Sequence, residues 1–205
     1  MEETWLDEFR DRAIKGQCRV AVDIGANAGE WTSWMADHFD VVLAFEPDPR
    51  AFAQLDATKK KNVIAVNAAV AAESGTSKLY LRPSPLQTSL LKDHPIGADG
   101  HETPAIEEVE TPTVAIDEII DMAGGHVDFL KMDIEGAEGD VLRAASDRRW
   151  LGTRWLIEVH DTRAGVGDFF TRIGFQNLRV QRHPYPDAHP QHFWVYVEDG
   201  LDEER

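Results

Sequence analysis

The sequence predicts a doubly wound α/β fold, in which helices cover both faces of a mostly parallel sheet. Two observations carry this prediction. Short apolar runs of strand length alternate with amphipathic stretches of helix length. In addition, residues 19–32, RVAVDIGANAGEWT, place a buried strand, a glycine turn and the start of a helix in direct succession. The length of 205 residues fits one such domain, so we expect residues 1–205 to form a single unit.

The turn after the first predicted strand has the form of a ligand-binding loop. Gly25 can adopt the dihedral angles of a tight turn, and Gly29 lets a ligand approach where a Cβ would obstruct it. A dinucleotide fingerprint needs further glycines where Asn27 and Glu30 stand. An acid in the first helical turn repels a pyrophosphate but suits a ligand with an ammonium group, and Asp23 adds a second negative charge. A tight turn without a ligand is the alternative.

Periodicity predicts the elements around this loop. Residues 1–16 have apolar side chains near helical spacing and end at a glycine, which predicts an N-terminal capping helix. Further along, we expect a helix to about residue 39, a strand at 41–45, a helix at about 50–60 and a strand at 63–66.

Acidic and small residues follow the second and third of these strands. Glu46, followed by Pro47, stands where doubly wound folds use an acid to accept hydrogen bonds from ribose hydroxyls. The alternative is a charge that favours the dipole of the next helix. Asn67, Ala68 and Ala69 follow the third strand, where small side chains leave space for an adenine ring, although an ordinary turn fits equally well.

The middle of the chain predicts a strand pair and a lid. Alternating residues at 77–81 and 108–114 indicate a β-hairpin or edge pair. Segment 83–108 is rich in Pro, Gly, Thr, Ser and His, and is too long for a plain loop in a compact domain. We therefore expect it to be a lid or substrate segment.

The second half continues the alternation. We expect a helix at 117–122, a strand at 127–132, a helix to about 145, a strand at 154–157, a helix at about 167–173 and strands at about 175–182 and 192–197. Asp133 follows one of these strands, and Glu158 and His160 follow the next. Because ligands bind outside the carboxyl ends of parallel strands, these three side chains are candidates for one site. Glu135 and Glu138 stand at the start of the helix after Asp133, where negative charge favours the helix dipole.

Three histidines near the C-terminus are weaker candidates. His183, His189 and His192 are separated by prolines and have no helix or strand register, so a solvated lid is a better interpretation than a metal cluster. Residues 198–205 form an acidic tail that we expect to fray.

Composition limits the partners. The net charge of −16, from 37 acidic and 21 basic residues, disfavours nucleic acid and anionic membrane surfaces, since both attract basic patches. Cys18 is the only cysteine, which excludes an internal disulfide and a zinc site built on cysteines. No apolar run is long enough for a transmembrane helix, and the N-terminus is too acidic for a signal peptide, so we expect a cytoplasmic protein. Composition and charge are compatible with a homo-oligomer as well as with a monomer.

Taken together, the motifs resemble the FkbM family of S-adenosylmethionine (SAM)-dependent methyltransferases. The matching segments are VDIGANAGEWT (22–32), FEPDP (45–49), NAAV (67–70), TSLL (88–91), VDFLKMDIEGAE (127–138) and IEVH (157–160). The resemblance covers about residues 19–160, and KMDIEGAE is its most specific piece. It implies a Rossmann-like class I methyltransferase fold with seven strands in the order 3-2-1-4-5-7-6, the last antiparallel. It also implies methyl transfer to a hydroxyl of a small, sugar-like acceptor or natural product.

The resemblance implies SAM as the cofactor, with its amino acid end and sulfonium at the glycine loop. The residues expected to bind it are Asp23, Gly25, Ala26, Asn27, Gly29, Glu30, Trp31, Thr32, Glu46, Pro47, Asn67, Ala68, Ala69 and Asp133.

Two mechanisms fit the remaining polar residues. A sugar hydroxyl is a poor nucleophile, so a general base helps. His160 is the first choice because an imidazole of ordinary pKa is deprotonated at pH 7, with Glu158 or Asp133 orienting it. Alternatively Asp133, Glu158 and His160, with Glu135 available, bind Mg²⁺ or a similar cation that lowers the pKa of the hydroxyl.

Competing functions are a catalytically silent SAM-binding or partner-binding domain, an NAD-linked oxidoreductase and a nucleic-acid methyltransferase. Asn27, Glu30 and the lack of a Tyr-x-x-x-Lys pair disfavour the oxidoreductase. The acidic balance and the lack of an Asp/Asn-Pro-Pro-Tyr motif disfavour nucleic acid. Residues from Asp161 onward carry no family motif.

Overall fold

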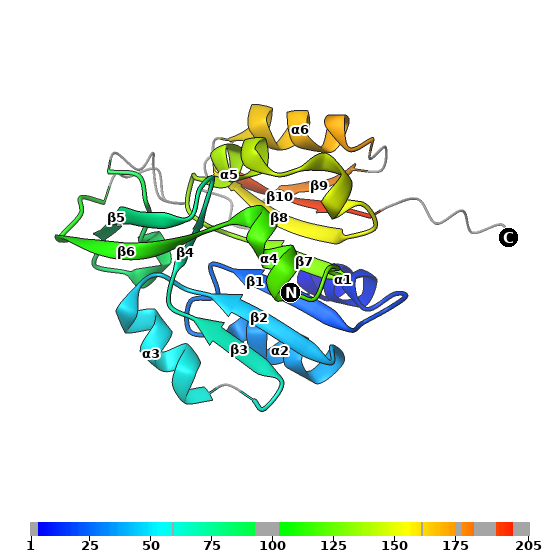
Figure 1. Ribbon diagram of the computed structural model, residues 1–205, viewed down its shortest axis with the longest axis horizontal. Coiled ribbons are helices and arrows are strands. Elements are labelled where there is room, and N and C mark those ends of the chain that lie inside the picture. Colours follow the sequence, from blue (N-terminus) through cyan, green and yellow to red (C-terminus); the bar gives the residue numbers. More distant parts are fainter. Residues whose placement is uncertain are drawn as a thin grey trace, which may run out of the picture.

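The computed structural model describes residues 4–58, 60–92, 103–160, 162–174, 178–182 and 192–198. They form a seven-stranded main sheet flanked by helices, and a separate three-stranded sheet (Figure 1). The main sheet has the strand order β3-β2-β1-β7-β8-β10-β9. Numbered along this sheet alone, the order is 3-2-1-4-5-7-6, and β10 is antiparallel to both of its neighbours. The predicted fold class and strand order are therefore confirmed.

The first half of the main sheet contains the glycine loop. Strand β1 pairs in parallel with β2 on one side and with β7 on the other. Apart from Asp23, strands β1 and β2 are apolar, and both are almost wholly buried, as expected for strands covered on both faces. The elements are α1 (Thr4–Ala13), β1 (Val20–Ile24), α2 (Glu30–His38), β2 (Val41–Phe45), α3 (Pro49–Thr58) and β3 (Val63–Val66).

The second half extends the sheet on the other side of β1. Its elements are α4 (Ile116–Met122), β7 (Phe129–Met132), α5 (Glu138–Ala144), the 3₁₀ helix η2 (Asp147–Trp150), β8 (Arg154–His160), α6 (Arg163–Arg172), β9 (Leu178–Arg182) and β10 (His192–Val197). The predicted end of the strand at residue 157 was wrong. Strand β10 pairs with β8 as far as His160, and this pairing holds Glu158 and His160 inside the strand.

The small sheet has the order β4-β6-β5, with β4 (Ala69–Ala71), β5 (Gly75–Leu81) and β6 (Glu107–Ala115). Strands β5 and β6 are antiparallel, which confirms the predicted edge pair. Ala69 pairs with Thr113, so it begins a strand and does not belong to a simple turn. Within the predicted lid, the 3₁₀ helix η1 (Pro85–Gln87) is described, whereas residues 93–102 lie outside the described residues.

Two apolar cores hold the helices against the main sheet. Alternate residues of a strand point to opposite faces, so Val22 and Ile24 of β1 lie in one core and Ala21 lies in the other. Helices α4, α5 and α6 cover the first face, and α1, α2 and α3 cover the second. The side chains that they bury include Ile119, Leu142, Phe169, Phe9, Met35 and Leu55. Among the described residues, no helix is both long and apolar enough to cross a membrane.

Candidate functional site

The glycine loop between β1 and α2 fits tightly against two neighbouring strand ends. Gly25 and Ala26 each donate their backbone N–H to the carbonyl oxygen of Phe45 at 3.0 Å. Gly25 has a φ of 75°, and a Cβ there would lie 1.8 Å from the carbonyl oxygen of Asp133. Backbone conformation and close approach therefore both require glycine at this position.

Glu46, directly after β2, is bound to the glycine loop. Its Oε2 accepts a 2.7 Å hydrogen bond from the backbone N–H of Asn27, and its Oε1 accepts one of 2.7 Å from the backbone N–H of Asp48. Burial raises the pKa of Glu46 to about 7, although these two hydrogen bonds act in the opposite direction. The side-chain amide of Asn67 donates to the carbonyl oxygen of Glu46 at 2.8 Å, which fixes the backbone from the β3 side.

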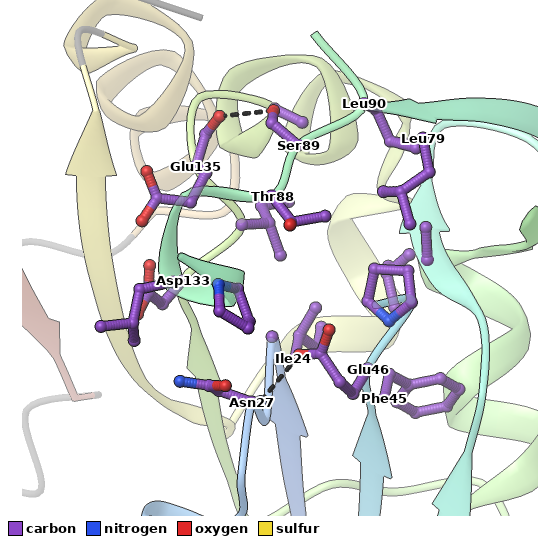
Figure 2. A pocket seen from close by; sticks show the side chains of 18 residues that line it. Ile24, Asn27, Phe45, Glu46, Leu79, Thr88, Ser89, Leu90, Asp133 and Glu135 are labelled. Carbon is purple, nitrogen blue, oxygen red and sulfur yellow. Dashed lines mark hydrogen bonds between the residues drawn. The ribbon is translucent and has the colours of Figure 1, made fainter. Parts of the chain in front are cut away.

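A cavity opens at this edge of the sheet, and it is lined by residues that follow β1, β2 and β7 and by residues of segment 85–90. In Figure 2, Asn27 and Glu46 lie at one end of the cavity, and Ser89 and Leu90 lie at the other. Apolar residues cover much of the wall: Ile24, Phe45, Val70, Leu79, Leu86, Leu90 and Ile134. Six residues predicted to bind the cofactor line the cavity: Gly25, Asn27, Glu46, Pro47, Ala69 and Asp133.

The TSLL segment connects two strand ends across the cavity wall. The hydroxyl of Thr88 donates to Oδ2 of the buried Asp48 at 2.7 Å, just after β2. The hydroxyl of Ser89 donates to the carbonyl oxygen of Glu135 at 2.8 Å, just after β7 (Figure 2). Part of the predicted lid is thus fixed to the site, a role that no local sequence pattern assigns to Thr88 or Ser89.

The buried side chain of Arg82 holds the same segment in place through hydrogen bonds to its backbone. Its side chain is buried, and burial lowers the pKa of its guanidinium group. It donates to the backbone carbonyl oxygens of Tyr80, Gln87, Leu91, Lys92 and Thr103. Sequence reasoning missed Arg82, because no local motif marks an arginine whose partners are backbone groups.

Asp133, Glu158 and His160 converge beside the cavity. One ligand atom from each lies within 4.8 Å of the others. The Nε2 atom of His160 is 3.9 Å from Asp133 Oδ1 and 3.8 Å from Glu158 Oε1. Of the three, Asp133 lines the cavity, so its carboxylate is the part of this cluster that a ligand there would meet first.

The surroundings of His160 favour its charged form. Burial alone would lower its pKa, but the carboxylates of Glu135, Glu138 and Glu158 raise it well above the ordinary value. An imidazole that is protonated at neutral pH cannot accept a proton. The prediction of His160 as general base assumed an ordinary pKa. That assumption does not hold in this structure.

Glu138 is the partner of His160 that sequence reasoning missed. The expected role was a charge at a helix N-terminus, but Glu138 is fully buried, and its Oε1 lies 3.0 Å from His160 Nδ1. Its carboxylate also accepts hydrogen bonds from the backbone N–H of Gly136 at 3.0 Å and the hydroxyl of Thr162 at 2.9 Å. The signal available was its place in KMDIEGAE, the most specific segment.

A buried lysine supports the glycine loop from behind. Lys131 donates from Nζ to the carbonyl oxygen of Gly25 at 2.9 Å, and Nζ is 3.4 Å from Asp133 Oδ2. Nζ is also 3.7 Å from Asp23 Oδ1, while Asp23 Oδ2 accepts a 2.6 Å hydrogen bond from Thr32. Asp23 and Thr32 are buried and hold the loop in place without lining the cavity.

The other residues predicted for the cofactor lie around the loop. Glu30 is exposed, and its carboxylate is 3.5 Å from the guanidinium group of Arg10, which lies over the ring of Trp31. Ala26, Gly29, Ala68 and Asn67 are not among the residues that line the cavity. Of the three C-terminal histidines, His192 lies on β10 with its ring 4.9 Å from that of His160. The other two, His183 and His189, lie outside the described residues.

Comparison with known proteins identifies the family. Residues 23–181 match the model of the methyltransferase FkbM domain. The chain is 30% identical over 191 residues to methyltransferase 1 of Beauveria bassiana, covering 83% of this chain and 75% of that protein. It is 28% identical over 179 residues to the 31-O-demethyl-FK506 methyltransferase FkbM of Streptomyces tacrolimicus, covering 73% of this chain and 68% of that protein.

The fold has relatives among solved structures. A Streptococcus mutans protein described as a methyltransferase, crystallised with SAH, superposes with a TM-score of 0.55 at 12% identity, covering 94% of this chain and 96% of that chain. This likeness supports the class I methyltransferase fold, while the family match covers most of the chain. The chain belongs to the FkbM family of SAM-dependent methyltransferases.

Proposed function

We propose that the protein transfers a methyl group from SAM to a hydroxyl group of a small acceptor, a sugar or a glycosylated natural product. The observation that carries the proposal is the cavity itself, which has Glu46 and Asn27 at one end and Asp133 on its wall. A relative that is 28% identical over 179 residues is named as a 31-O-demethyl-FK506 methyltransferase, a name that refers to an oxygen atom.

The cofactor half of the cavity has a donor set that fits SAM. The carboxylate of Glu46 has lone pairs left to accept hydrogen bonds from ribose hydroxyls. Asn27 and Gly25 would face the amino acid end, and Ala69 leaves space for the adenine ring. When bound, SAM supplies an activated methyl group, so that a carbon–oxygen bond forms as the carbon–sulfur bond breaks, giving SAH, a methyl ether and the hydroxyl proton.

On the acceptor side, we assign direct contact with the hydroxyl to Asp133, which lines the cavity. Its carboxylate would accept the hydrogen bond of the hydroxyl and orient its oxygen for in-line attack. Glu158 and His160 would act as positioning residues behind Asp133, because neither lines the cavity.

The acceptor is proposed to be a small molecule because the net charge of −16 is unfavourable for a nucleic acid. Incubation with SAM and a panel of sugars and glycosylated natural products tests this, with SAH release and methylated product followed by mass spectrometry. We expect a methyl ether product, and D133N should lower kcat while SAM binding is retained. Product methylated on nitrogen or carbon would contradict hydroxyl transfer. SAM binding with no transfer to any hydroxyl in the panel would favour the catalytically silent alternative.

A further inference from the structure

The side chains behind the cavity form a set of metal-type donors. Glu158 and His160 are two residues apart on β8, so both point to the same face of the main sheet. Asp133 approaches them from the end of the neighbouring strand β7. Two carboxylates and one imidazole are donors that divalent cations such as Mn²⁺, Mg²⁺ and Zn²⁺ accept.

The spacing of these donors is close to that of ligands on one ion. His160 Nε2 is 3.9 Å from Asp133 Oδ1, 3.8 Å from Glu158 Oε1 and 3.7 Å from Glu135 Oε2. Donors bound at about 2.1 Å to one octahedral ion are about 3 Å apart when adjacent and about 4.2 Å apart when opposite. A small contraction of the side chains would therefore bring the donors to bonding distance.

The orientation of His160 is set in the way usual for a metal-bound histidine. Its Nδ1 lies 3.0 Å from the carboxylate of Glu138, which leaves Nε2 directed at the other three carboxylates. Glu138 is in turn fixed by Thr162 and by the backbone N–H of Gly136. A carboxylate on the far nitrogen of a liganding histidine fixes its tautomer and ring orientation.

A second observation, independent of the donor spacing, concerns the carboxylate of Asp133. Asp133 Oδ1 is buried and has no hydrogen-bond partner among the described residues. A buried carboxylate oxygen without a partner is costly, because it has lost its hydration. The carboxylates of Asp23, Asp133, Glu135, Glu138 and Glu158 also outnumber the two basic side chains of Lys131 and His160 in the same cluster. A divalent cation would reduce this excess of negative charge.

We propose that Asp133, Glu158 and His160 bind one divalent cation, with Glu135 able to add a fourth donor and Glu138 holding His160 in place. The oxygen-rich donor set with one imidazole favours Mn²⁺ or Mg²⁺. Binding displaces the proton that the carboxylates otherwise keep on His160. The ion would lie at the cavity wall through Asp133, where it can bind the acceptor hydroxyl and lower its pKa. That role rests on the proposed function, whereas binding of the ion does not.

Titration of the full-length, metal-free chain with Mn²⁺ tests the site, with free Mn²⁺ followed by electron paramagnetic resonance in the absence of SAM and acceptor. We expect one tight site per chain, displaced by excess Mg²⁺. D133N and E158Q should each weaken it at least about tenfold, and E138Q should weaken it by about tenfold through His160. The matched control is E108Q, which removes an exposed carboxylate paired with Lys78 in the small sheet.

Two outcomes would overturn the inference. One is wild-type affinity for Mn²⁺ no higher than that of D133N and E158Q, with thermal unfolding showing that all three are folded. The other is an equal loss in E108Q, which would indicate only general attraction to an acidic surface. SAM titration of the same samples separates the two proposals: SAM binding without Mn²⁺ binding rejects the metal site alone, and absence of SAM binding rejects the proposed function.

Discussion

The backbone N–H of Asn27 donates a 2.7 Å hydrogen bond to Oε2 of Glu46, which joins the glycine loop after β1 to the acid after β2 (Figure 2). The acid is therefore part of the loop's structure and also part of the cavity wall. Because Glu46 is buried, its pKa is raised to about 7, so its charge state changes in the physiological range.

SAM affinity should rise with pH through about 7. Ionised Glu46 accepts hydrogen bonds from the ribose hydroxyls more strongly than the protonated acid does. E46Q should bind SAM about tenfold more weakly at pH 8 and lose most of the pH dependence between 6 and 8. Calorimetric titration at several pH values measures both effects. If the SAM affinity of wild type changed with pH in parallel with that of E46Q, the ribose-binding role of Glu46 would be contradicted.

The same residue should make the unliganded protein less stable as pH rises. The ordinary pKa of 4.5 applies in the unfolded chain, whereas the folded value is about 7, so the folded state binds more protons between these values. The stabilising contribution is complete below pH 4.5 and is lost as pH rises through 7, by up to about 3 kcal/mol. Urea unfolding of wild type and E46Q across this pH range measures the loss. The free energy of unfolding of E46Q should lack this part of the pH dependence. The neighbouring charges Asp48 and Lys131 remain in both proteins.

Gly25→Ala should disrupt the site. The new Cβ would lie 1.8 Å from the carbonyl oxygen of Asp133, in a backbone conformation with φ of 75° that alanine disfavours. We expect a loss of stability above about 4 kcal/mol and loss of SAM binding in any folded fraction.

The control for this variant is Gly124→Ala. Its φ is 77°, but no atom lies within 4 Å of the place that the new Cβ would occupy, so only the left-handed strain of about 1–2 kcal/mol is added. Thermal unfolding compares the two proteins. An equal loss in both would show that close approach to Asp133 contributes nothing.

Arg82→Met should loosen the TSLL side of the cavity. The change removes the donor to five backbone carbonyl oxygens that the buried guanidinium group now satisfies. We expect a loss above about 2 kcal/mol and faster limited proteolysis within residues 80–92. Arg149→Met removes a more exposed arginine paired with Asp121 and should cost no more than about 1 kcal/mol. Similar proteolysis of both variants would argue against the assigned role of Arg82.

Local sequence patterns predicted the main sheet well, because most of its strands are short apolar runs that end in a distinctive polar or glycine-containing segment. The glycine loop and Glu46 could be placed because they follow directly from strand ends. The C-terminal end of β8 could not be placed from local patterns, because it is set by pairing with β10 from a distant part of the chain. The roles of Arg82 and Glu138 also depend on partners brought together by folding, so local spacing did not reveal them; only the place of Glu138 in KMDIEGAE marked that residue.

The most direct test of SAM as the cofactor is calorimetric titration of the purified, metal-free chain with SAM and, separately, with NAD⁺. We predict micromolar binding of SAM, a loss of affinity in E46Q and no binding of NAD⁺, because Asn27 and Glu30 replace the glycines of a dinucleotide loop. A folded protein that binds NAD⁺, or that gives no heat with SAM, would contradict the assignment of this cavity to SAM.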